Sequence, residues 1–144
     1  MHYRRLGQSG LKVSEISLGA WVTFGNQIDE STAINLIKES FDQGINFFDN
    51  ADMYANGEAE IVMGKAIATM PREELVISSK VFWPTFKGPN GRGLSRKHIT
   101  ESINASLKRL GTDYVDLYFC HRYDPDTPVE EVARTMTDLI HQGK

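Results

Sequence analysis

The chain has 144 residues, a net charge of −3 and a single cysteine, Cys120. This length suits one domain with a sizeable core, and the mildly acidic balance argues against a nucleic-acid-binding protein. A lone cysteine forms no internal disulfide, so a reducing compartment fits best. No apolar run reaches the ~18–20 residues that span a bilayer, and the N-terminus lacks the apolar segment of a signal peptide. We therefore expect a soluble cytoplasmic protein with no membrane or nucleic-acid partner.

One pattern recurs four times: a short apolar run followed by a helical pattern. After a β-hairpin expected over residues 3–13, the expected strands are residues 16–20, 45–48, 75–79 and 114–119. Runs this short and this apolar are typical of buried strands in a parallel sheet. Four successive βα units predict such a sheet with its helices packed outside.

The four expected helices each carry an apolar stripe. The stripes consist of Ile34, Ile37 and Phe41; Ile61, Val62, Ala66 and Ile67; Ile99, Ile103, Leu107 and Leu110; and Val132, Met136, Leu139 and Ile140. The second helix must end before Pro71, and Ser95 is a favourable N-cap for the third. Residues 127–130 predict a capping box with Pro128 in the first turn of the fourth.

Glycines and one long loop mark the ends of elements. Gly44, Gly111 and Gly143 each follow a helix, where glycine is the preferred left-handed stop. The longest irregular stretch is residues 83–94, and a loop of this length is often functional. Its segment 88–93 is glycine-rich but lacks the Gly-Lys-Ser/Thr of a phosphate-binding loop.

Polar side chains come at the ends of three expected strands. Asp49 follows the second strand, Lys80 the third and His121 the fourth, and Tyr54 lies in the loop after the second. Each residue alone has an ordinary structural interpretation. Because the carboxyl ends of parallel strands lie on one side, we expect the four to meet where (β/α) barrels carry catalysis.

These four residue types suit the reduction of a carbonyl group, which needs a hydride on carbon and a proton on oxygen. A tyrosine has an ordinary pKa near ~10, and a nearby lysine cation lowers it. An aspartate keeps the lysine charged and oriented. A neutral histidine can donate a hydrogen bond to the carbonyl oxygen. The hydride must come from a cofactor, because no side chain supplies one.

Asp49, Tyr54, Lys80 and His121, in this order and context, resemble the catalytic tetrad of the aldo-keto reductases. Residues 44–49 and 51–54 look like that family's signature. Residues 21–25, 93–99 and 124–128 resemble the subgroup that includes potassium-channel β-subunits and their bacterial relatives. The resemblance covers essentially the whole chain. It implies a (β/α)8 TIM-type barrel, of which residues 1–144 form the N-terminal half: the first four βα units after a β-hairpin.

The resemblance also implies a function, the NADPH-dependent reduction of aldehydes and ketones to alcohols. Tyr54 is then the acid, Lys80 and Asp49 tune it, and His121 orients the substrate. The residues implied near the nicotinamide end of NADPH are Gly19, Ala20, Trp21, Gln27 and Asp49. Those implied at the substrate mouth are Trp21, Tyr54, Phe82, Trp83 and His121. Ordinary core packing is the alternative for the aromatic ones. Barrel phosphate sites follow strands seven and eight, so the contacts to the cofactor phosphates are expected outside this chain.

Two alternatives stay open: a non-catalytic half-barrel that serves as an assembly module, and a channel β-subunit-like regulatory protein. Channel-associated members carry asparagine at the position of His121, so the histidine favours a metabolic enzyme. The sequence lacks a Gly-x-Gly-x-x-Gly dinucleotide motif and any metal-ligand spacing of its histidines, so neither a Rossmann dehydrogenase nor a metal site is expected.

The pattern also predicts assembly. Four strands cannot close an eight-stranded barrel, and open strand edges invite pairing with another chain. We expect apolar residues such as Ile77, Val115 and Leu117, or their alternating neighbours, to face the barrel interior. The chain is therefore predicted to form a homodimer or larger homo-oligomer, with the helices over residues 31–43 and 127–142 near the contacts.

Overall fold

A four-stranded parallel sheet organises the chain in the computed structural model, which describes residues 1–144. Its strands are β3 (Leu18–Gly19), β4 (Phe47–Asp49), β5 (Val76–Val81) and β6 (Leu117–Cys120), and their order in the sheet is the order in the chain. A separate antiparallel hairpin joins β1 (Tyr3–Arg5) to β2 (Lys12–Ser14). The predicted hairpin and parallel sheet are confirmed, and together they form a partial barrel.

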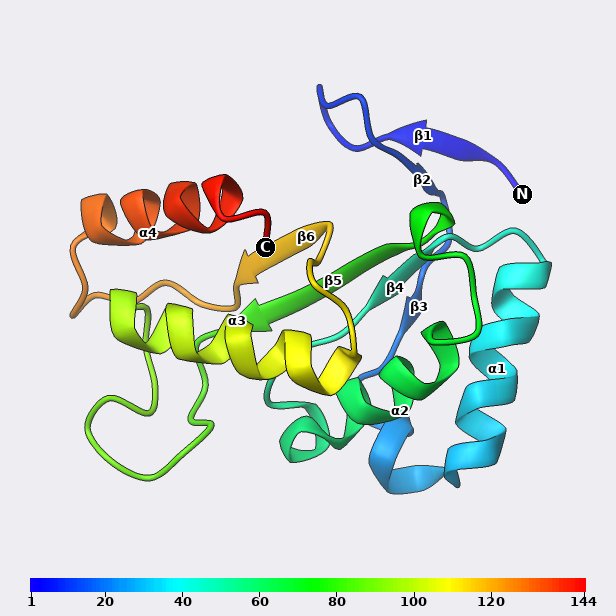
Figure 1. Ribbon diagram of the computed structural model, residues 1–144, viewed down its shortest axis with the longest axis horizontal. Helices are drawn as coiled ribbons and strands as arrows, with labels where there is room; N and C mark the ends of the chain where they lie inside the picture. The colour runs from blue at the N-terminus through cyan, green and yellow to red at the C-terminus, as the bar shows by residue number, and fades with distance from the viewer.

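The helices pack outside the sheet, as predicted. They are α1 (Glu30–Asp42), α2 (Glu58–Ile67), α3 (Arg96–Leu110) and α4 (Val129–His141), with helical turns η1 (Thr23–Gln27), η2 (Tyr54–Gly57) and η3 (Arg72–Glu74) between them. Figure 1 shows α1, α2 and α3 along one face of the sheet, with α4 beside β6 at the end of the chain. No helix has the length and apolar character needed to cross a membrane.

The hairpin lies at the amino ends of the strands (Figure 1). Asn46, just before β4, holds it there: its side chain accepts from the Ser14 N–H at 2.8 Å and donates to the Lys12 carbonyl at 3.1 Å. The loops after β4, β5 and β6 therefore lie at the opposite end of the sheet, which leaves the carboxyl ends of the strands available for a site.

Caps explain where the helices begin, and one predicted cap is wrong. The Ser95 hydroxyl accepts from the His98 N–H at 3.2 Å, which confirms the N-cap of α3. At α4 no side chain caps the first turn, and Pro128 occupies the N-cap position itself. The Thr127 hydroxyl donates instead to the Asp124 carboxylate at 2.8 Å. The predicted capping box is thus absent, because the helix starts one residue later than predicted and Thr127 lies outside the capping position. The predicted glycine stops are confirmed, since Gly44, Gly111 and Gly143 have φ of 90°, 67° and 72°.

The bounds of all four strands differ from the prediction. The second strand is Phe47–Asp49, so Asp49 is its last residue and does not follow it. The first strand is shorter, and Ile16 lies outside it, 61% exposed. The third strand continues to Val81, so Lys80 lies inside β5 and not after it. The fourth strand begins at Leu117 because the residues before it contact Arg72, whose guanidinium donates to the Tyr114 carbonyl and to Asp116.

The two faces of the sheet differ in character because side chains alternate along a strand. Phe48, Ile77 and Val81 are fully buried in the core beneath the helices. Ile77 and Val115 both belong to this core, so their predicted place on the barrel interior is wrong. Leu117 and its alternating neighbour Phe119 pair in register with Ser78 and Lys80, on the other face, and Phe119 is 42% exposed.

Candidate active site

Lys80 joins the candidate residues at the carboxyl end of the sheet. Its ammonium donates to Asp49 Oδ2 at 2.7 Å, to the Asn50 carbonyl at 2.8 Å and to the Tyr54 hydroxyl at 3.1 Å. An ammonium has three donors, so these contacts use all of them and fix its position. Three of the four residues predicted to meet are therefore in direct contact.

Asp49 is oriented by a residue that the sequence did not single out. The Ser78 hydroxyl donates to Asp49 Oδ1 at 2.6 Å and is completely buried. Ser78 lies two residues before Lys80 in β5, hence on the same face of the strand. The spacing of two residues from Lys80 is the sequence feature from which a role of Ser78 at this site could have been predicted. Both oxygens of the Asp49 carboxylate are thus engaged, one by Ser78 and one by Lys80.

Tyr54 begins the short turn η2, which has an unusual backbone. Ala55 and Asn56 have φ of 50° and 55°, and Gly57 has φ of 95°. Two consecutive non-glycine residues in the left-handed region cost free energy, and such outliers cluster at functional sites. At Gly57 the φ of 95° lies in the left-handed region, which side chains rarely adopt, and this favours glycine there. The turn holds the Tyr54 ring 8% exposed, with its hydroxyl at Lys80.

His121 lies next to this group, directly after β6. Its backbone N–H donates to the Val81 carbonyl at 2.9 Å, which extends the pairing with β5. The imidazole packs edge-on against Tyr54, with 5.9 Å between the ring centroids. Burial, together with the positive charges of Lys80 and Arg122, lowers the pKa of His121 below its ordinary value. The ring is therefore neutral at neutral pH, and its Nδ1 is buried without a hydrogen-bond partner.

Two indoles flank the pair of Tyr54 and His121. Trp21 is 68% exposed, with its ring 6.5 Å from that of Tyr54. Trp83 lies on the other side, with its ring 6.4 Å from that of His121. Phe82 is 7% exposed, belongs to the hydrophobic core and packs edge-on against Trp83. It is thus a packing residue, the alternative that the sequence left open, whereas the two tryptophan rings pack against Tyr54 and His121.

The residues predicted near a nicotinamide ring divide into two groups. Gly19 pairs with Asp49 in the sheet, and the Ala20 N–H donates to the Asp49 carbonyl at 2.9 Å, so residues 19–21 adjoin the site. A Cβ on Gly19 would meet no atom within 4 Å, so there is open space beside this residue. Gln27 is exposed at the end of η1, and no contact joins its side chain to the four residues.

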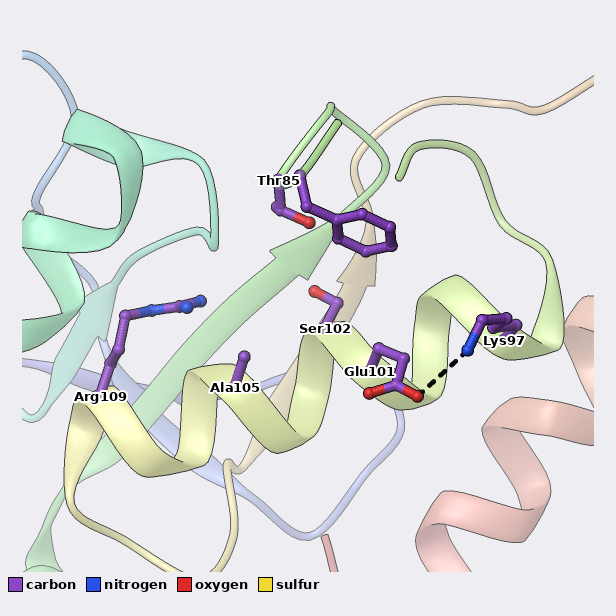
Figure 2. Close-up of a pocket in the computed structure, with 7 residues that line it drawn as sticks. Thr85, Lys97, Glu101, Ser102, Ala105 and Arg109 are labelled. Atoms are coloured by element: carbon purple, nitrogen blue, oxygen red, sulfur yellow. Dashed lines mark hydrogen bonds and ion pairs between the residues drawn. The ribbon is translucent and has the colours of Figure 1, made fainter. Parts of the chain in front are cut away.

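A separate cavity lies on the outer side of the molecule. Figure 2 shows its lining residues along α3 and the loop after β5, with Ser102, Ala105 and Arg109 on the helix. Its volume is about 440 Å³. None of the four candidate residues lines it, so it is not the site where their chemistry would occur.

A parallel βα sheet with Asp49, Tyr54, Lys80 and His121 at its carboxyl ends defines a partial (β/α) barrel with a polar site at the usual face. Comparison with family models matches residues 15–144 to the aldo/keto reductase family. The chain belongs to this family.

Relatives and solved structures agree with this assignment. The chain is 55% identical to an Arabidopsis thaliana protein and 54% identical to an Oryza sativa protein, both named "Probable voltage-gated potassium channel subunit beta". Each match covers 99% of this chain and 44% of the relative. The crystal structure of a thermostable aldo-keto reductase, Tm1743, in complex with the inhibitor epalrestat superposes with a TM-score of 0.87 at 36% identity, over 99% of this chain and 51% of that one. The chain thus spans about half the length of these relatives.

Proposed function

We propose that this chain carries the catalytic face of an aldo-keto reductase that reduces aldehydes and ketones to alcohols with NADPH. The observation that supports this most is the Lys80 ammonium, which contacts both the Asp49 carboxylate and the Tyr54 hydroxyl. Because the phenol oxygen accepts from Lys80, its own O–H stays free to donate to a carbonyl oxygen in the mouth. The exposed thiol of Cys120, which forms no disulfide, fits a cytoplasmic setting for this enzyme.

Each of the four residues then has a distinct role. Tyr54 gives its proton to the carbonyl oxygen as the reaction proceeds, and Lys80 stabilises the phenolate that remains. Asp49, held by Ser78, keeps the ammonium in place. The neutral imidazole of His121 donates a hydrogen bond that positions the carbonyl. The aromatic borders, Trp21 and Trp83, favour substrates with an apolar part next to the carbonyl group.

The residues around Gly19 fit a nicotinamide ring. NADPH, when bound, supplies the hydride that reduces the carbonyl carbon. The open space over Gly19 and the exposed ring of Trp21 border Asp49 and Tyr54, so a flat ring held there would adjoin the proton donor. By the family resemblance, Gln27 would contact the same end of the cofactor, although no contact yet ties it to the site.

Substitution of the acid tests the proposal in a completed barrel. We suggest a chimera in which the part of the Arabidopsis relative beyond the matched region follows Lys144. Tyr54→Phe should lower kcat for an aldehyde by about 10²–10⁴-fold, the usual contribution of general acid catalysis, and leave NADPH affinity nearly unchanged. Lys80→Met should be almost inactive too. The matched control is Tyr123→Phe, since Tyr123 is 81% exposed and near His121 in sequence. Retention of most of the turnover by Tyr54→Phe would contradict the assigned acid.

A second candidate is a regulatory subunit of a channel. The 55% identity to a plant protein named as a probable potassium channel β-subunit favours it. A half-barrel that serves as an assembly module would likewise be a non-catalytic protein. His121 argues against it, because the channel-associated members carry asparagine there. A regulatory protein predicts that the parent chimera and Tyr54→Phe are equally inactive, while both still bind NADPH.

We also propose that the 144-residue chain self-associates. In the four-stranded sheet, β6 has one neighbour, β5, and its other edge offers unpaired backbone groups. Apolar side chains lie exposed close to it, with Phe119 at 42% and, on α4, Val129 at 67% and Ile140 at 76%. A second copy could cover this edge and these side chains together, and symmetric pairing is the commonest form of oligomer.

A further inference from the structure

The loop between β5 and α3, which carries Trp83, is fastened by a carboxylate from a different loop. Asp124 lies between β6 and α4 and is 8% exposed. Its Oδ2 accepts from the Leu94 N–H at 2.6 Å and from the Thr127 hydroxyl at 2.8 Å, and its Oδ1 accepts from the Asp126 N–H at 3.1 Å. One buried carboxylate therefore joins the end of the Trp83 loop to the loop that follows His121.

Gly93 makes this contact possible. Its φ is +90°, and a Cβ there would lie 2.6 Å from Asp124 Oδ2, so a side chain would break the fastening. The Gly93 N–H donates to the Phe82 carbonyl at 2.7 Å, which closes the loop onto the residue before Trp83. Asp124 is thus linked to the segment that carries Trp83 by two hydrogen bonds, one from the Leu94 N–H to its carboxylate and one from the Gly93 N–H to the Phe82 carbonyl.

A buried histidine holds the same loop from α3. His98 is completely buried, with Nδ1 2.8 Å from the Gly93 carbonyl and Nε2 3.2 Å from the Thr85 hydroxyl. A carbonyl only accepts, so Nδ1 donates to Gly93, and Nε2 lies within hydrogen-bond distance of the Thr85 hydroxyl. The two ends of the loop, at Thr85 and Gly93, are therefore tied to one imidazole. The hydrogen bond that joins this loop to the segment after His121 is the one from the Leu94 N–H to Asp124, beside the packing of Arg122 and His121 on the Trp83 ring.

We infer that Asp124 is a positioning residue that sets the spacing between Trp83 and His121, and through it the size of carbonyl substrate that the mouth accepts. The specificity part rests on the proposed reductase function, whereas the positioning part does not. Asp124 comes three residues after His121 and binds the end of the loop that carries Trp83. The centroids of the Trp83 and His121 rings lie 6.4 Å apart. Burial alone would raise the pKa of Asp124, but the hydrogen bonds from Leu94, Thr127 and Asp126 and the nearby Arg92 lower it overall. The carboxylate is thus charged at neutral pH, and its hydrogen bonds are of the strong, charge-assisted kind.

The first experiment uses the 144-residue chain and needs no activity. Trp21→Phe leaves Trp83 as the single tryptophan, so its fluorescence reports the loop alone. In this background Asp124→Ala should increase the quenching of Trp83 by acrylamide and speed trypsin cleavage after Lys87 and Arg92, which are both exposed. Mass spectrometry of the fragments separates cleavage in the loop from general unfolding, which would expose sites throughout the chain.

Two further variants sharpen this result. Asp124→Asn should be intermediate, because the amide oxygen can keep Leu94 and Thr127 while the amide nitrogen cannot accept from the Asp126 N–H. Asp126→Ala is the matched control, since Asp126 is an exposed aspartate in the same loop that reaches Asp124 only through its backbone. Equal quenching and cleavage in Asp124→Ala, Asp124→Asn and Asp126→Ala would overturn the positioning role.

The second experiment measures specificity in the completed chimeric barrel. Asp124→Ala should raise KM for a bulky aromatic aldehyde about tenfold, because the loosened loop that carries Trp83 must be ordered when the aromatic ring binds, while kcat and NADPH affinity stay close to those of the parent. The KM for a small aldehyde should change much less, so the ratio of the KM for the bulky aldehyde to the KM for the small one should rise. An equal change for both aldehydes would overturn the specificity role. A parent chimera that reduces no aldehyde would refute the proposed function and this specificity role, and the fluorescence and cleavage results would still decide the positioning role.

Discussion

Asp52 offers a sharp test of the electrostatics behind the site. It is 2% exposed, beneath the outer face of the sheet and two residues before Tyr54. The Ser102 hydroxyl donates to its Oδ2 at 2.6 Å, and its Oδ1 has no partner. Burial raises the pKa of Asp52 to about 6 from the ordinary 3.8, opposed by the Ser102 hydrogen bond and reinforced by the negative charge of Glu60.

The sign of the effect follows from proton binding. Between pH of about 4 and about 6 the folded chain holds this proton and the unfolded chain does not, so the free energy of unfolding falls as pH rises through that window. Above it the charged, buried carboxylate costs about 3 kcal/mol, at 1.36 kcal/mol for each tenfold change in proton affinity. Asp52→Asn removes the charge, and its amide can still accept from Ser102. Its N–H also becomes available to Tyr118, whose buried hydroxyl has no partner.

We therefore expect Asp52→Asn to raise the free energy of unfolding at neutral pH by about 1–3 kcal/mol. The variant should also lose the part of the fall in this free energy between pH of about 4 and about 6 that is due to Asp52. Urea denaturation followed by tryptophan fluorescence at a series of pH values measures both quantities. Asp113→Asn is the matched control, because Asp113 is exposed, and its curve should run parallel to that of the parent. A destabilised Asp52→Asn with an unchanged pH slope would refute the reasoning.

Three other outcomes are expected. Arg109→Met should lower the free energy of unfolding by about 3 kcal/mol, because it leaves the fully buried Glu60 carboxylate without the guanidinium 2.7 Å away. Lys65→Met breaks a half-exposed surface pair and should lower it by less than about 1 kcal/mol. Equal losses of stability in thermal denaturation would contradict this. The 144-residue chain should bind NADPH far more weakly than a complete barrel, since each missing charged phosphate contact is worth roughly 1.5–3 kcal/mol; sub-micromolar binding by a monomer in fluorescence titration would exclude this. Light scattering should find the chain as a dimer or larger, and a stable, cooperatively folding monomer at micromolar concentration would show that it caps its own edges.

The meeting of Asp49, Tyr54, Lys80 and His121 could be predicted from the sequence because the rule behind it is topological. Parallel strands end on one side, so polar residues at strand ends meet there whatever the details of packing. The prediction held for Lys80 even though it lies inside β5 and not after it. Ser78 was not predicted as a site residue because a serine within an apolar run suggests only a small buried residue of the strand. It lies two residues before Lys80, however, and therefore on the same face of β5, where it contacts Asp49.

The buried polar network behind the sheet could not be predicted in this way. Glu60 is completely buried, although a charged residue in an amphipathic helix is ordinarily assigned to the solvent face. Its partners are Arg109 at 2.7 Å and Ser79 at 2.6 Å, which are 49 and 19 residues away. No local periodicity links such positions, because the pairing depends on how α2 and α3 pack over β5. Sequence patterns of one element do not contain that information.

The error at α4 has a different origin, because the residues involved lie within one short segment of the chain. Thr127 has the right identity and spacing for a capping box, and in an isolated segment its hydroxyl would accept from a backbone N–H of the first turn. In the folded chain the hydroxyl lies 2.8 Å from a buried carboxylate, Asp124. The helix begins at Val129 with Pro128 as its N-cap, so Thr127 lies one residue outside the capping position and no side chain accepts from the first turn. The Thr127 hydroxyl donates to the charged Asp124, a hydrogen bond roughly twice as strong as a neutral one. Thr127 thus contacts Asp124, the carboxylate that also joins the two loops through Leu94, and a broken local rule of this kind is a sign of a functional constraint.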